Sequence, residues 1–224
     1  FLPAEKGRLA AGGRLQALAF ADPALPADSR NWNAVQLPLG EARKVRWIDM
    51  DEVESPADDL RARGHAKGAV LFARGEGVEI GLRRDGAREF FFTCTSGGPD
   101  GYGQIMRYVQ SPREGASDEA SEAATLELFV ESRDPLAMDY ADNLTIAPNG
   151  HLIVCEDRTD GKINHLKGVT PQGQIYTLAR LNADTELAGA CFSPDGEVLF
   201  VNAYAPGRTL AIRGPWNRVS TVPA

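Results

Sequence analysis

The sequence predicts an all-β fold made of β-propeller blades, each a four-stranded antiparallel sheet. A turn of the form Pro-x-Gly separates two apolar runs at 148–150 and again at 194–196. The two prolines are 46 positions apart (194 − 148), and a third copy of the turn lies between them at 171–173. Two such hairpins in about 46 residues make four strands, which is the size of one propeller blade. A β-sandwich also has short strands and frequent turns, but not this doubled hairpin period.

The hairpin pattern justifies the strands in the C-terminal part directly. Proline presets φ for a turn, and glycine or asparagine supplies the positive φ that hairpins need. We therefore expect strands on both sides of each turn. They are 145–146, 152–155, 174–178, 190–192 and 198–201.

The N-terminal part follows the same scheme less cleanly. Apolar runs predict strands of an earlier blade at 13–20 and 45–48. A further blade with a longer outer connection is expected from the runs 68–73, 88–94, 103–109 and 126–130. Residues 58–63 are expected to form a short helix. Segments 22–33 and 111–124 are expected to be exposed loops, and the second of them is rich in Glu, Ser and Ala and lacks an apolar period.

The number of blades predicts an incomplete propeller. About two and a half to three blades are recognisable, whereas propellers close with about four to eight. The chain opens on Phe1-Leu2-Pro3, which resembles the end of a strand. We expect one domain over residues 1–224, forming the C-terminal portion of a propeller.

Composition excludes some classes of function. The net charge of −7, from 24 basic and 31 acidic residues, argues against a nucleic-acid-binding protein. The sequence has no run of about 18 apolar residues, so no membrane span is expected. Its first residues lack the basic start and apolar centre of a signal peptide.

The three cysteines do not form a disulfide framework. Cys94, Cys155 and Cys191 each lie in an apolar, strand-like run, which favours small buried side chains. A soft metal ligand or a reactive thiol is the alternative for each. No Cys-x-x-Cys pair supports a zinc site.

Polar clusters at the ends of the apolar strands are the candidate site. The clusters with acidic residues suit a hard cation such as Ca²⁺, which takes about six to eight oxygen ligands. Each cluster alone could instead be a solvated strand end. The three histidines form no His-Glu-x-x-His pair, and neither a Gly-x-Ser-x-Gly elbow nor a phosphate-binding loop occurs. The clusters are 74–77, 95–98, 142–143, 155–157 and Glu186.

Four further residues leave alternatives open. Arg74 lies two positions before Glu76, where its guanidinium could bind a phosphate bidentately or pair with an acid at the surface. The pair Asn164-His165 favours a turn over a site contact. Asn202, after an apolar strand, could be a ligand or a hydrogen-bonding residue at a sheet edge.

Several motifs resemble the PhoX-like family of calcium- and iron-dependent alkaline phosphatases. The similarity runs from about Gly13 to Trp216 and includes a closing Gly-Pro-Trp. It implies a β-propeller with Ca²⁺ and Fe³⁺ in its channel that hydrolyses phosphoesters. The motifs are FARGEG at 72–77, TCTSGGP at 93–99, PNGHLIVCED at 148–157, NHLKGVTPQGQIY at 164–176 and ELAGACFSPDGEVLFVN at 186–202.

The resemblance also assigns roles to individual residues. Arg74 would contact the phosphate as the catalytic and substrate-binding residue, and Glu76 would be a metal ligand. Asp142, Glu156 and Glu186 are the next expected metal ligands. The reserves are Asp157 and Asn143.

The sequence departs from the family in one respect. A cysteine in an NCAGG-type stretch and a CEE-type motif, which the family carries in its first half, are not present. The resemblance therefore implies a C-terminal half whose partner is the missing N-terminal half, and which is inactive on its own. It also implies export to the periplasm or the cell exterior. A non-catalytic binding propeller and a calcium-dependent lactonase-type propeller are the alternatives.

Overall fold

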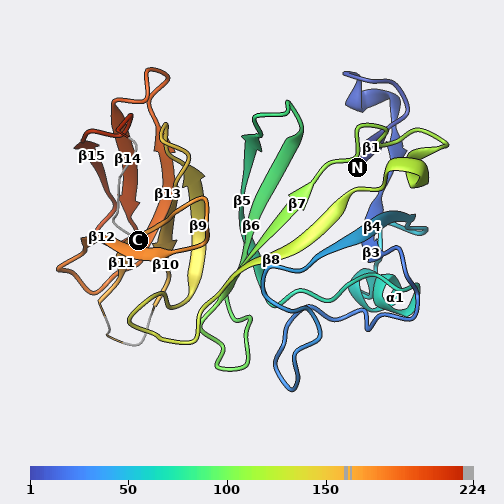
Figure 1. Cartoon of the computed structure of the whole chain (residues 1–224), viewed down its shortest axis with the longest axis horizontal. Helices are drawn as coiled ribbons and strands as arrows, with labels where there is room; N and C mark the ends of the chain where they lie inside the picture. The colour runs from blue at the N-terminus through green and yellow to red at the C-terminus, as the bar shows by residue number, and fades with distance from the viewer. Residues whose placement is uncertain (159–160, 162, 219–224) are drawn as a thin grey trace.

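The computed structural model describes residues 1–158, 161 and 163–218, and it is nearly all-β (Figure 1). Its antiparallel sheets stand side by side as propeller-like blades, which confirms the predicted fold class. The strands are β1 (Leu2–Pro3), β2 (Gly13–Arg14), β3 (Gln16–Phe20), β4 (Ala42–Asp49), β5 (Gly75–Leu82), β6 (Arg88–Cys94), β7 (Gln104–Val109), β8 (Thr125–Glu131), β9 (Ala141–Ile146), β10 (Leu152–Glu156), β11 (His165–Val169), β12 (Ile175–Arg180), β13 (Leu187–Phe192), β14 (Val198–Ala203) and β15 (Arg208–Arg213).

The C-terminal blades follow the predicted hairpins. Strands β9 to β12 form a four-stranded meander, and β13 to β15 form the next sheet, at the left of Figure 1. In each repeat the turn glycine has a positive φ, between 71° and 84°, and donates its N–H to the residue three positions earlier at 2.8 Å. Identical turn chemistry therefore produces the same hairpin three times. The glycines are Gly150, Gly173 and Gly196.

The N-terminal strands differ from the prediction in two places. The six-stranded sheet has the order β3-β4-β8-β7-β6-β5, and its edge strand β5 begins at Gly75, after the segment 68–73 that we expected to be a strand. That segment forms only isolated bridges, from Ala69 and Leu71. The expected strand 13–20 is divided between β2 and β3. Glutamates and glycines within β5 had hidden its strand pattern.

Successive sheets pack through strands whose two faces are both buried. In β10, Val154 lies in one apolar cluster while its neighbours Ile153 and Cys155 lie in the next. Alternate side chains of a strand point to opposite faces, so β10 joins the cores on its two sides. Burying one such aliphatic side chain stabilises the fold by about 1.5–3 kcal/mol.

Strands β5 and β9, from neighbouring sheets, approach each other very closely. Strand β5 packs against β9, and β9 in turn packs against β13. At Gly77 an added Cβ would lie 2.5 Å from the carbonyl oxygen of Asp142, so only glycine permits this approach. Thr93 of β6 donates its hydroxyl proton to the same carbonyl and accepts the Gly77 N–H at 2.9 Å.

The predicted short helix is α1 (Leu60–Ala66), seven residues long. It is the longest helix in the described part of the chain, and none there is long and apolar enough to cross a membrane. The expected loop 111–124 contains one 3-10 turn, Glu119–Glu122.

Two of the three cysteines are buried, as predicted, and one is not. Burial raises the pKa of the Cys94 and Cys155 thiols to about 12. Cys191 is exposed, because its neighbour Ala190 occupies the inward position on β13 and alternation turns Cys191 outward. The expectation of a buried Cys191 was therefore wrong.

Candidate metal centre

Three carboxylates meet where the blades adjoin. Asp142 lies at the start of β9, Glu186 immediately precedes β13, and Asp157 immediately follows β10. Oxygens of the three side chains lie within 4.8 Å of one another, and all three residues are half-buried. The convergence comes from the packing of β9 against β13, since the residues are up to 44 positions apart in sequence (186 − 142).

A buried asparagine holds two of these carboxylates in place. The Asn164 side-chain amide donates to the carbonyl of Arg158 at 3.0 Å and to that of Thr185 at 2.9 Å. Its oxygen accepts the Arg158 N–H at 2.8 Å. Asn164 therefore ties together the backbone beside Asp157 and beside Glu186.

Glu76 and Arg74 lie at the open side of the group. Arg74 Nη2 is 3.7 Å from Glu76 Oε1 and 3.8 Å from Asp157 Oδ2. Both side chains are nearly half-exposed, at 49% for Arg74 and 44% for Glu76. The backbone of Arg74 has φ of 54°, an uncommon conformation for a residue other than glycine, and such strain clusters at functional sites.

The carboxylates perturb one another. A hydrogen bond shared with Asp157, followed by burial and the charges of Asp157 and Asp142, raises the pKa of Glu186 to about 7. Burial, followed by the charges of Glu76 and Asp157, raises the pKa of Asp142. Like charges at this distance disfavour full ionisation. The negative charges of Asp142, Asp157 and Glu186 are therefore not fully balanced by nearby positive charge.

The residues fit a hard cation. Carboxylate oxygens are the ligands that Ca²⁺ prefers. Asp157 Oδ1 is buried and has no hydrogen-bond partner among the described residues, a costly arrangement that a bound cation would relieve. Ion binding would also remove the repulsion between Asp142, Asp157 and Glu186.

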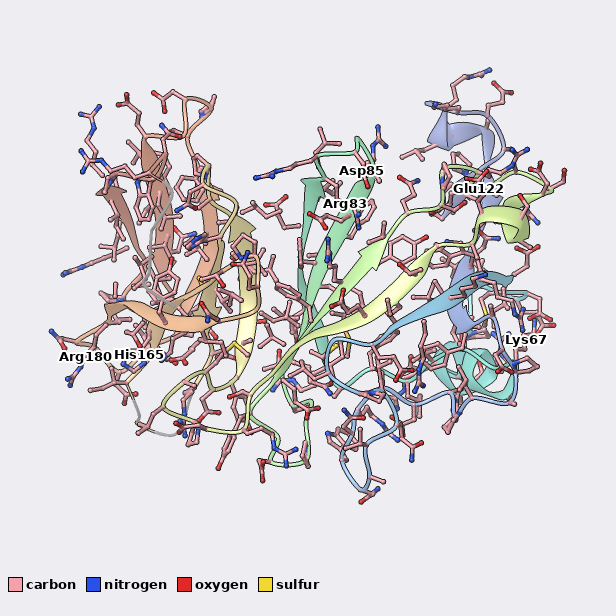
Figure 2. All side chains as sticks on the ribbon, viewed as in Figure 1. Lys67, Arg83, Asp85, Glu122, His165 and Arg180 are labelled. Atoms are coloured by element: carbon pink, nitrogen blue, oxygen red, sulfur yellow. The ribbon has the colours of Figure 1, made fainter. Side chains whose placement is uncertain are left out.

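Glu156, an expected metal ligand, lies elsewhere. Its side chain is buried and accepts the backbone N–H groups of Asp139 and His165, both at 3.0 Å, and the His165 ring nitrogen Nδ1 lies 2.9 Å away. Lys167 Nζ, also fully buried, is 3.7 Å from Glu156 Oε1. Figure 2 shows His165 beside Arg180, its cross-strand partner on β12. The structure therefore places Glu156 in a buried polar network, apart from Asp142, Asp157 and Glu186.

The asparagines and the glycine-rich turn also have structural partners. Asn143 Oδ1 accepts the Ala190 N–H at 2.7 Å and joins β9 to β13, while Asn202 Oδ1 accepts the Thr209 hydroxyl at 2.7 Å. The Ser96 carbonyl accepts the indole N–H of Trp32 at 2.8 Å. The sequence predicted a turn at Asn164-His165. In the structure His165 begins β11, and the Asn164 side chain hydrogen-bonds to the backbone of Arg158 and Thr185.

Sequence reasoning ranked Asp157 behind its neighbour Glu156. The pairing of β10 with β9 shifts register between Val154 and Glu156. This irregularity decides which of the two carboxylates faces the site, and simple alternation cannot reveal it. Position gave no signal either, because Glu156 is the last residue of β10 and Asp157 follows it directly.

One comparison with known proteins, that with protein families, agrees with the motif resemblance. The sequence profile of the family described as alkaline phosphatase PhoX matches residues 3–207. No curated protein matches the chain. Among solved structures, a candidate 6-phosphogluconolactonase from Bacteroides uniformis is 17% identical with a TM-score of 0.37, and the match covers 79% of this chain and 48% of that one. The family match spans most of the sequence, so the chain belongs to the alkaline phosphatase PhoX family.

Proposed function

We propose that the protein is a metal-dependent phosphatase that hydrolyses phosphoesters at the group formed by Asp142, Asp157 and Glu186. The observation that carries the proposal is the convergence of these three carboxylates beside Arg74, in a chain of the PhoX family. Phosphoryl transfer depends mainly on positioning and on neutralising negative charge, and a cation site beside an arginine can do both.

The cation would be held by Asp142, Asp157 and Glu186, with Glu76 alongside. Ca²⁺ suits this oxygen-only set, and Fe³⁺, which the family resemblance also implies, accepts carboxylate oxygens as well. Such a cation, when bound, neutralises phosphate oxygens and lowers the pKa of a coordinated water. The raised pKa of Glu186 and the unpartnered Asp157 oxygen support its binding.

Arg74 is proposed to bind the phosphate. Its guanidinium presents paired N–H donors that match two phosphate oxygens. Half of its side chain is exposed, and its ion pairs with Glu76 and Asp157 are long, at 3.7 and 3.8 Å. Loose pairs of this kind leave the donors free to turn toward an anionic substrate.

The place of action is part of the same proposal. The family resemblance implies export, so we propose that the protein acts in the periplasm or outside the cell. Fractionation of the native host, followed by detection of the protein in each fraction, tests this. Detection in the cytoplasm alone would contradict it.

Metal content and turnover, measured together, test the proposed function. The full-length protein, purified without chelators, is expected to contain calcium or iron and to release phosphate from 4-nitrophenyl phosphate. Asp157→Asn and Glu76→Gln should each lose bound metal and lower turnover by about 100-fold, the scale of removing one electrostatic contact to a transition state. Glu79→Gln is the matched control, because Glu79 lies on the same strand and contacts Thr145 instead of the site.

Three outcomes would contradict the proposal. Full turnover by both site variants would exclude the assignment of the site. Bound metal without turnover of any phosphoester would favour a non-catalytic binding propeller. Turnover of lactones in place of phosphoesters would favour the lactonase-type alternative.

A further inference from the structure

A groove of about 890 Å³ adjoins the candidate metal centre. It lies between helix α1, strand β3 and the segment 69–74, at the right of Figure 1. Arg74 belongs to its lining and is also the residue paired with Asp157, so the groove begins where the acidic site ends. A volume of this size holds a small organic molecule.

The groove is largely apolar. Aliphatic and aromatic side chains make up most of its lining, including Leu15, Met50, Leu60, Val70, Leu71 and Phe72. Three arginines and one acidic residue, Asp58, complete its charged groups. Such a lining favours a ligand with an apolar body and a negatively charged end.

An exposed tryptophan stands in the lining, held in a fixed position. Trp32 donates its indole N–H to the Ser96 carbonyl at 2.8 Å, and the guanidinium of Arg30 lies 4.3 Å from the centre of its ring. Arg30 is itself held by a bidentate contact with Asp28, at 2.8 and 2.6 Å. Trp32 nevertheless remains 44% exposed. A rigid, exposed aromatic ring in a groove is a ready surface for stacking an organic group.

We propose that this groove binds the organic group of the phosphoester, so that the preferred substrates are phosphomonoesters carrying a large apolar or aromatic group. The proposal rests on the proposed function, since the phosphate is taken to bind at Arg74. The ester would then extend from the acidic site across Arg74, with its organic group against Trp32 and Phe72. Small polar phosphoesters would leave the groove empty and gain nothing from it.

A blocked groove tests the proposal. Ala62, an exposed groove residue on α1, is replaced by tryptophan, and Trp32→Ala removes the stacking surface in a second variant. Ala66→Trp is the matched control, because Ala66 is also exposed on α1 and does not line the groove. Each full-length protein is assayed with 1-naphthyl phosphate and with glycerol phosphate.

The expected result is selective. Both groove variants should lower kcat/KM for 1-naphthyl phosphate by about tenfold, which corresponds to losing the burial of part of an aromatic group. Turnover of glycerol phosphate should stay unchanged in all variants, and Ala66→Trp should behave as the unaltered protein. Equal turnover of both substrates, unaffected by either groove variant, would overturn the groove proposal and leave the phosphatase proposal standing.

A binding measurement separates the two proposals further. Calorimetric titration with 1-naphthylmethylphosphonate, which is not hydrolysed, should show tighter binding than methylphosphonate. Ala62→Trp should abolish that preference. If the protein hydrolyses no phosphoester but this preference and its loss are observed, the groove assignment survives and the phosphatase function fails. Equal affinity for the two phosphonates would overturn the groove assignment.

Discussion

Glu156 and Asp157 are neighbours in sequence, but they lie in regions of opposite electrostatic character. Glu156 has partners on every side: two backbone N–H groups, the His165 ring and Lys167. Asp157 lies among like charges. It shares a hydrogen bond with Glu186, one of its oxygens is buried and unpartnered in the described structure, and its contact to Arg74 is long, at 3.8 Å. A step of one residue along the chain thus leads from a carboxylate whose oxygens are paired to one that lies among like charges with an unpaired oxygen.

The difference distinguishes a structural charge from a candidate ligand. A buried carboxylate that is fully paired contributes to a defined packing arrangement, and opening it would cost free energy. A carboxylate crowded by others gains free energy when a cation arrives. Both residues lie at the end of a strand, so position does not distinguish them. Whether the carboxylate oxygens already have hydrogen-bond or ion-pair partners is the better criterion for a metal ligand.

Breaking the buried polar network around Glu156 should have the largest effect on stability. Lys167→Met removes the cation 3.7 Å from Glu156 and its hydrogen bonds to the Leu136 carbonyl and the Thr177 hydroxyl. We expect the free energy of unfolding to fall by about 3–5 kcal/mol, because the Glu156 carboxylate remains buried without the lysine cation beside it. Urea unfolding, followed by circular dichroism, measures the loss.

The matched control for that variant is Lys44→Met at an exposed position, where a change within about 0.5 kcal/mol is expected. The double variant Glu156→Gln/Lys167→Met should recover part of the stability, since no unpaired charge is left. A loss below about 1 kcal/mol in Lys167→Met would show that the network is not a structural element of the blade.

A smaller effect is expected where the two blades approach at the acidic site. Gly77→Ala would place a Cβ 2.5 Å from the Asp142 carbonyl and 2.8 Å from the Asn143 Cα, so β5 and β9 must separate. We expect a loss of about 1–3 kcal/mol and weaker calcium binding, because Asp142 moves with its backbone. Unfolding in urea and calcium titration by calorimetry measure the two effects.

Gly75→Ala is the control on the same strand. An added Cβ at Gly75 meets no atom within 4 Å, so stability and calcium binding should be nearly unchanged. Equal effects of the two substitutions would mean that the close approach of β5 to β9 does not determine the geometry of the site.

The smallest effect is expected from chemical labelling of the cysteines, which compares the two regions without changing the stability of the protein. Cys155 lies beside both regions, and burial, together with the charge of Asp142, raises its thiol pKa to about 12. At pH 8 its reactive thiolate is therefore scarce, and the same holds for Cys94. In the native protein we expect 5,5′-dithiobis(2-nitrobenzoate) to label only the exposed Cys191, and all three cysteines in urea.

Cys191→Ser should remove the labelling of the native protein and leave its unfolding unchanged. Rapid labelling of Cys155 in the native state would instead show that the blade β9 to β12 opens beside the acidic site.

The blade repeat could be predicted from sequence because its causes are local. The three turns at Gly150, Gly173 and Gly196 need a residue that tolerates a positive φ, and the proline two positions earlier presets the chain for the turn. The edge strand β5 escaped prediction because it contains Gly75, Gly77 and Gly81, and glycine is depleted in strands and typical of turns. Its pairing with β6, a tertiary contact, makes it a strand.

The candidate site could be predicted from the sequence only in part. Sequence placed Asp142 and Glu186 at strand ends, and the structure brings them together with Asp157 through the packing of β9 against β13. No local rule distinguishes Asp157 from Glu156, because a shift of strand register turns one carboxylate to the site and the other to Lys167. Sequence alone therefore determined the turns, the strands beside them and the family, since these depend on local backbone chemistry and motif. The tertiary structure decided which acids meet, because that depends on how separate sheets pack.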